Sequence, residues 1–141
     1  DSVRRERTSF GDWYFESLRE FPAEHYLRLD VDVKVRHVPV EVFAHDFDIA
    51  IAKERKGTMN NGVVFVKNRE FFRDCQEAYW TRTSKDNWND IQVATQMVID
   101  DGRFRIRKLD PEVYNHTPDR PGDFRQAKLV HFSGKKDWFG R

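Results

Sequence analysis

Segments with strand-like and helix-like periodicity alternate along this sequence, which restricts the chain to a fold that combines strands and helices around one sheet. The clearest strand covers residues 27–36, where apolar residues at every second position alternate with charged ones. The apolar positions are Leu27, Leu29, Val31, Val33 and Val35, and the charged positions are Arg28, Asp30, Asp32, Lys34 and Arg36. This period of two predicts one continuous strand with its apolar residues on one face.

The remaining segments complete an α/β pattern. Apolar residues at helical spacing predict helices over residues 12–21, 68–79 and 87–101, and a short helical turn over 39–43. Apolar runs predict strands over 48–52, 62–66, 104–109 and 128–132, with loops over 53–61 and 111–122. We therefore predict a single α/β domain over residues 1–141 with a mostly parallel or mixed sheet, in which residues 1–11 form an irregular end.

Composition excludes several classes of protein. The 25 Lys and Arg against 24 Asp and Glu give a net charge of +1, so the chain is not a basic nucleic-acid-binding body. A single cysteine, Cys75, excludes a disulfide scaffold, and no apolar run approaches the roughly 20 residues that cross a bilayer. The single cysteine and the lack of a targeting segment in this chain favour a cytoplasmic location.

Aromatic side chains follow the apolar faces of the predicted elements. Core packing is the expected role of Trp13, Phe15, Phe65, Phe71 and Phe72. Trp88 and Trp138 lie beside the polar motifs described below and are the only tryptophans that we consider for ligand contact.

The segment Asp30-Val31-Asp32 contains two carboxylates that project from the same face of the predicted strand. Two carboxylates at this spacing are a natural site for a divalent cation, and ligands bind at strand ends in open α/β sheets. The alternative is a solvated, self-neutralising face formed with the neighbouring basic residues. Spacing alone favours the solvated face, because alternating charges are common on exposed strand faces.

Three further polar motifs follow along the chain. Asn60-Asn61-Gly62 directly precedes an apolar strand and is either a turn or a ligand-facing edge. Asp90, three residues after Asn87, is either a helix-capping acid or a catalytic group. Near the C-terminus, His131 ends an apolar strand, and Gly134 and two lysines, Lys135 and Lys136, follow it. These groups offer an imidazole ligand and cations for a phosphate, or a hydrogen-bonded histidine and solvated lysines.

The order of these motifs resembles that of GT-A-fold nucleotide-sugar glycosyltransferases, and most closely glycosyltransferase family 8, the retaining, glycogenin-like group. The series includes the Asp-x-Asp (DxD) pair, the Asn-small-Gly motif, an Asp/Gln-rich helix start with Asp90 and Gln92, the segment Tyr114-Asn115, and a closing His-x-x-Gly followed by Lys and Trp. The resemblance covers about residues 13–138. It departs from the family at Asp137, where the family has proline, and it lacks the family's N-terminal half, which holds the nucleotide base.

The resemblance implies a GT-A-like (Rossmann-like) mixed sheet flanked by helices and incomplete at its N-terminus. It implies that Asp30, Asp32 and His131 hold Mn²⁺ or Mg²⁺, and that Lys136 contacts the diphosphate of the donor. Asn60, Asn61, Gly62 and Gly134 would bind the donor, and Asp90 and Gln92 would be catalytic. The implied partners are a nucleotide-sugar donor, usually a UDP-sugar, and a carbohydrate or other hydroxyl acceptor. Transfer with retention of the anomeric configuration would proceed through a carboxylate nucleophile or by attack of the acceptor hydroxyl on the same face of the sugar.

Two other interpretations are compatible with the residues. In the first interpretation, the chain is a haloacid-dehalogenase-like phosphatase, because the first motif of that family is also a strand that ends in Asp-x-Asp. That family gives His131 no role. In the second interpretation, the chain is a truncated or decayed transferase-like domain that binds ligands without turnover.

Overall fold

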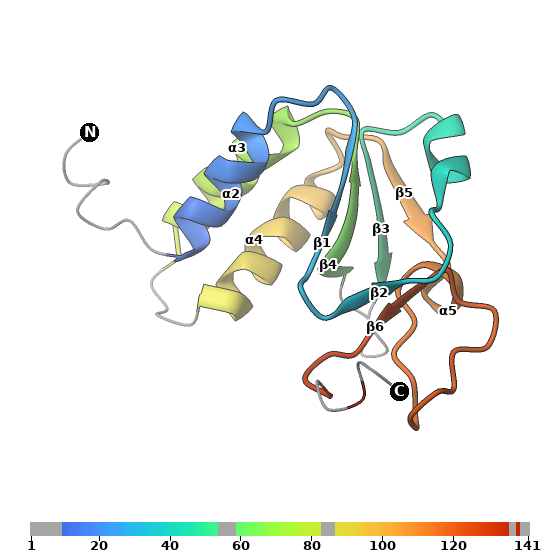
Figure 1. Ribbon diagram of the computed structural model, residues 1–141. Helices are drawn as coiled ribbons and strands as arrows, with labels where there is room; N and C mark the ends of the chain where they lie inside the picture. Colours follow the sequence, from blue (N-terminus) through green and yellow to red (C-terminus); the bar gives the residue numbers. More distant parts are fainter. Residues whose placement is uncertain (1–9, 54–58, 83–86, 136–137, 139–141) are drawn as a thin grey trace.

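A mixed four-stranded sheet lies at the centre of the computed structural model, which describes residues 10–53, 59–82, 87–135 and 138 (Figure 1). Its strands lie in the order β1 (Tyr26–Leu29), β4 (Met59–Val66), β3 (Ile49–Lys53) and β5 (Ile106–Leu109). β4 pairs antiparallel with β1 and β3, whereas β3 and β5 are parallel. The predicted α/β class with a mixed sheet is therefore confirmed.

The sheet is buried on both faces, which explains why its inner strands are continuous apolar runs. Along β4, Val64 and Val66 pack on the side of the long helices, whereas Val63 and Phe65 pack on the opposite side. All four side chains are buried. The alternation of the strand therefore divides one apolar run between two cores.

Three helices cover one face of the sheet: α2 (Phe10–Glu20), α3 (Glu70–Trp80) and α4 (Asn87–Asp101) (Figure 1). Gly11 lies against the ring of Tyr79, and a Cβ at this position would come 2.6 Å from the Tyr79 hydroxyl, so a glycine lets α2 and α3 approach closely. α4 has its predicted bounds and ends before Gly102, whose φ is +79°. Phe10 and Gly11 belong to α2, so the irregular end expected over residues 1–11 is wrong for these two residues; residues 1–9 lie outside the described part of the chain.

A second, two-stranded sheet lies on the other side, formed by antiparallel β2 (Val33–Val35) and β6 (Leu129–His131). An isolated parallel bridge joins His116 to Val130 on β6. The short helices η1 (Val40–Ala44) and α5 (Pro111–Tyr114) complete this side, and α5 falls within the loop predicted over residues 111–122. Among the described residues, no helix is both long and apolar enough to span a bilayer.

The continuous strand predicted over residues 27–36 is interrupted by a turn at Asp30-Val31-Asp32. The backbone N–H of Asp30 donates to Gly62 O on β4 at 2.8 Å, and that of Val33 donates to Asp30 O at 3.2 Å. Val31, expected on the apolar face, is 94% exposed at the tip of the turn. The strand breaks because β1 pairs within the first sheet and β2 pairs within the second, so the chain must change direction between them.

Candidate functional site

Three ligand-type side chains meet where the two sheets join. Asp30 and Asp32 extend from the turn between β1 and β2, and His131 ends β6 directly opposite Val33. His131 Nε2 lies 3.0 Å from Asp32 Oδ1 and 3.5 Å from Asp30 Oδ2. One potential ligand atom from each residue lies within 4.8 Å of the others. The pairing of β2 with β6 therefore brings together residues that are far apart in the sequence.

The other nitrogen of His131 contacts a residue to which the sequence assigned no role. His131 Nδ1 lies 3.0 Å from Asn115 Oδ1, and both side chains are buried. Asn115 follows α5 and caps it, since its backbone N–H donates to Pro111 O. No local spacing pattern relates an asparagine at the end of a short helix to a histidine on another strand, so only its place in the motif series pointed to this segment.

The Asn60-Asn61-Gly62 motif forms an irregular part of β4 that faces His131. The register between β3 and β4 shifts here, and Asn60 Oδ1 accepts a hydrogen bond from the backbone N–H of Gly62 at 2.7 Å. A Cβ on Gly62 would lie 2.7 Å from His131 Nδ1 and closer still to its Cε1. Glycine is therefore required here so that the imidazole can lie against the strand.

Asn61 places an unpaired acceptor in the same region. Its Nδ2 donates to Thr95 Oγ1 on α4 at 2.9 Å, and the Thr95 hydroxyl donates to Ile91 O at 2.8 Å. Because the single hydroxyl proton of Thr95 is used by Ile91, Thr95 must accept from the amide, which fixes the amide orientation. Asn61 Oδ1 is buried and has no hydrogen-bond partner among the described residues. A buried acceptor in this state costs free energy unless a donor reaches it.

Arg28 adds a positive charge beside the two carboxylates. Its guanidinium forms an ion pair with Asp30, donates to Asn61 O at 2.6 Å, and lies 4.7 Å from the centre of the Tyr14 ring. Burial raises the pKa of Tyr14 far above its usual value, against the opposing effect of Arg28, so Tyr14 is a neutral phenol beneath the guanidinium. The solvated, self-neutralising face considered from the sequence is thus found only in part, because both carboxylates also approach His131.

A cavity of about 680 Å³ opens over this cluster. Its lining includes Asp30, Asp32, His131, Asn60, Asn61, Gly62, Gln92 and Gly134, all of them site residues predicted from the sequence. Its volume is that of a small-molecule site, with a few polar groups converging on one wall. Most of the predicted site thus lies around one cavity, although the role of each residue remains a prediction.

One predicted site residue does not line this cavity, and another lies outside the described residues. Asp90 is buried in α4, where its Oδ1 accepts a hydrogen bond from Arg82 Nε at 3.0 Å. Lys136 lies outside the described residues. Its neighbour Lys135 donates to Pro118 O at 3.0 Å and does not line the cavity.

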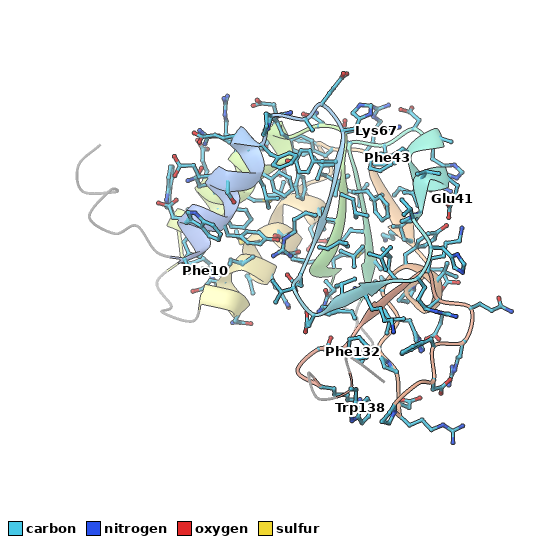
Figure 2. All side chains as sticks on the ribbon, in the orientation of Figure 1. Phe10, Glu41, Phe43, Lys67, Phe132 and Trp138 are labelled. Atoms are coloured by element: carbon cyan, nitrogen blue, oxygen red, sulfur yellow. The ribbon has the colours of Figure 1, made fainter. Side chains whose placement is uncertain are left out.

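The aromatic residues at the cavity differ from those expected. Trp13, predicted in the core, is 58% exposed, and it lines the cavity together with Phe10, whose ring centre is 5.5 Å away. Trp138, considered for ligand contact, packs in the small cluster that contains Phe132, far from Phe10 (Figure 2). The side chain of Trp88 lies outside the described part of the structure. Helical spacing assigned Trp13 to the apolar side of α2, but Tyr14, Phe15 and Leu18 form the buried face.

Comparisons with known proteins identify the fold. The sequence matches no protein-family model and no curated protein. The structure is similar to that of a glycosyltransferase involved in the glycosylation of the major capsid of PBCV-1, with a TM-score of 0.62 and 22% identity, over 94% of this chain and 77% of that one. It is also similar to the glycosyltransferase GlyE of Streptococcus pneumoniae TIGR4, with a TM-score of 0.62 and 16% identity, over 94% of this chain and 39% of that one.

The fold is that of glycosyltransferase structures. The mixed sheet flanked by helices, implied by the resemblance in motif order, is confirmed over most of the chain. Membership of family 8 remains a prediction.

Proposed function

We propose that this chain is a metal-dependent glycosyltransferase domain that moves a sugar from a nucleotide-diphosphate donor, with UDP as the expected nucleotide, to a hydroxyl acceptor. Transfer of a hexose with retention of configuration is the finer form of this proposal. The observation that carries it is the meeting of Asp30, Asp32 and His131 at the wall of one cavity in a glycosyltransferase fold.

The residues present fit a divalent cation. Two carboxylates and one imidazole provide the oxygen and nitrogen ligands that Mn²⁺ and Mg²⁺ take, and all three face the cavity, so further positions are open to a ligand. The guanidinium of Arg28 forms an ion pair with Asp30, and a cation would add positive charge between the two carboxylates. A cation bound by these three residues would neutralise charge that develops on the departing diphosphate.

Other groups around the cavity suit a sugar diphosphate. Arg28 offsets the charge of Asp30 on this wall, so a divalent cation bound there would leave the wall with a net positive charge toward an anionic donor. The exposed rings of Trp13 and Phe10 provide apolar faces on which a sugar ring stacks.

The position of His131 also bears on the alternatives. An Asp-x-Asp phosphatase has no use for an imidazole 3.0 Å from the second aspartate, so we do not favour that function. A domain without turnover would bind the donor at the same residues but would not release UDP from a UDP-sugar. Assay of UDP release therefore separates an active transferase from an inactive one.

Thermal unfolding with UDP, GDP and CMP, each with and without Mn²⁺, tests the proposal. A ligand at 100 times its Kd stabilises the folded state by about 2.7 kcal/mol, so binding is readily seen as a higher midpoint. We expect stabilisation that requires both Mn²⁺ and one nucleotide, and we expect Asp32→Asn to lose it while remaining folded. Asp101→Asn, which alters an exposed carboxylate at the end of α4, is the matched control. Stabilisation by no pair, or full stabilisation of Asp32→Asn, would contradict the proposal.

A further inference from the structure

We infer that Asn115 is a positioning residue that fixes the tautomer of His131, so that its Nε2 atom is a metal ligand. The inference rests on the proposed function, because it assumes that a divalent cation binds at the cavity. It concerns a residue that touches neither the cavity nor the two carboxylates and acts only through the imidazole.

The first step is the chemistry of the hydrogen bond between Asn115 and His131. Asn115 Oδ1 lies 3.0 Å from His131 Nδ1, and an amide oxygen can only accept. His131 Nδ1 must therefore carry the proton. In a neutral imidazole the other nitrogen, Nε2, then has a free lone pair.

The second step is where that lone pair points. His131 Nε2 lies 3.0 Å from Asp32 Oδ1 and 3.5 Å from Asp30 Oδ2. In this tautomer three electron-pair donors face one another with no proton between them. A cation placed among these three donors would stabilise them, so the tautomer selected by Asn115 is the one that a metal site needs.

The third step is that both partners are held firmly. Asn115 donates from its backbone to Pro111 O at 3.0 Å, and the next residue, His116, exchanges hydrogen bonds with the backbone of β6 at Leu129 and His131. On its other side the imidazole lies against Gly62, where even a Cβ would not fit. Asn115 is 7% and His131 5% exposed, so water does not compete for Nδ1.

The α5 segment that bears Asn115 is itself tied to the rest of the fold. The Tyr114 hydroxyl donates to Glu41 Oε1 at 3.0 Å, and Lys128 forms an ion pair with the same carboxylate. Lys128 also donates from its backbone to Val113 O at 2.7 Å. The amide of Asn115 is thus presented to His131 by a hydrogen-bonded framework on both sides.

The experiment has two readouts. Long-range ¹⁵N–¹H correlation spectra of the metal-free protein at about pH 9, above the usual imidazole pKa, show which nitrogen of His131 carries the proton. The His131 signal is assigned by its loss in His131→Asn. Titration calorimetry then gives the affinity for Mn²⁺ of the wild type and of Asn115→Leu, Asn115→Asp and Tyr114→Phe.

We expect an Nδ1–H tautomer in the wild type. Asn115→Leu removes the acceptor at similar volume and should lower Mn²⁺ affinity by about 10- to 100-fold. Asn115→Asp keeps an acceptor and should keep at least the wild-type affinity. Tyr114→Phe breaks one hydrogen bond of the same framework but keeps the Asn115 amide and its backbone hydrogen bonds, so it should lower the affinity by much less than Asn115→Leu does.

The outcomes separate this inference from the proposed function. An Nε2–H tautomer in a protein that binds Mn²⁺ would overturn the inference alone, as would unchanged affinity in a folded Asn115→Leu. If Asn115→Leu does not fold, a loss of affinity in Asn115→Asp equal to that of His131→Asn would overturn it. A wild type that binds neither Mn²⁺ nor Mg²⁺ would overturn the metal site of the proposed function, and the inference with it.

Discussion

At the scale of single residues, Gly62 shows how the absence of a side chain shapes the site. Its backbone N–H is bound by Asn60 Oδ1, its carbonyl accepts from Asp30 N, and its Cα faces the imidazole of His131. The Asn-Asn-Gly motif thus links the aspartate turn and the histidine through one residue. A motif that the sequence associated with donor binding also has this structural role.

Gly62→Ala tests that role. The added methyl group would overlap His131 and Asn60, so we expect a loss of about 1–3 kcal/mol in the free energy of unfolding. Displacement of the imidazole should also lower Mn²⁺ affinity by about 10-fold or more. Urea unfolding and titration calorimetry measure the two effects.

Gly102→Ala is the control for Gly62→Ala. It strains a positive φ of +79° at the end of α4, where a Cβ meets nothing within 4 Å. It should destabilise by about 1–3 kcal/mol without changing Mn²⁺ affinity. If Gly62→Ala binds Mn²⁺ as well as Gly102→Ala does, the proposed contact does not position His131.

Single residues were unequally predictable. Asp30, Asp32 and His131 could be grouped in advance because ligand chemistry restricts residue type and the motif order supplied the grouping. Asn115 could not, because an amide that orients a histidine leaves no spacing pattern in either segment. Trp13 was misplaced because helical periodicity does not distinguish the edge of the buried face from its centre.

At the scale of elements, the break between β1 and β2 is the main departure from the sequence prediction. A period of two persists through Asp30-Val31-Asp32 even though the hydrogen-bond partner changes from β4 to β6. Periodicity reports which side chains share a face, but it carries no information about which strand lies alongside. The bounds of α4, in contrast, followed from its apolar spacing and from Gly102.

Asp48 joins three elements at the opposite end of β3. Its side chain accepts hydrogen bonds from Arg105 N at 2.7 Å and from Asn68 Nδ2 at 3.3 Å, and thereby ties the start of β3 to β5 and to the end of β4. Burial disfavours the charged form, but hydrogen bonds from Arg105 and Asn68 outweigh it and hold the pKa of Asp48 below its usual range. The ionised carboxylate is therefore the form that stabilises the fold.

Asp48→Asn should make stability depend less on pH. Because the pKa of Asp48 is lower in the folded state, its contribution is complete above the unfolded pKa and is lost as pH falls through the folded one. We expect a loss of about 1–2 kcal/mol at pH 7 that shrinks between about pH 5 and about pH 2. Urea unfolding at a series of pH values measures this difference.

Asp46→Asn is the control for Asp48→Asn. Asp46 pairs with the same Arg105 at 2.6 Å, but its side chain is 83% exposed, so its loss should change stability by less than about 1 kcal/mol. A difference between wild type and Asp48→Asn that stays constant down to about pH 2 would contradict the role assigned to Asp48.

At the scale of the whole molecule, the site forms where two sheets and a helical layer meet. The turn between β1 and β2 supplies Asp30, the four-stranded sheet supplies the Asn-Asn-Gly motif, and the two-stranded sheet supplies His131. The helices α2 and α4, which cover the larger sheet (Figure 1), supply Trp13 and Gln92. No one element contains the site, so it exists only in the folded chain. The sequence indicated the class of fold, whereas the division into two sheets that places this junction needed the structure.

Titration calorimetry with Mn²⁺ tests the metal site at the centre of the proposed function most directly. The proteins to compare are the wild type, Asp32→Asn and Asp101→Asn. We predict one Mn²⁺ per chain for the wild type and for Asp101→Asn, and loss of binding in a folded Asp32→Asn, because Asp32 is one of three ligand-type residues around the same point. Equal binding by Asp32→Asn and the wild type, or no binding by the wild type, would contradict it.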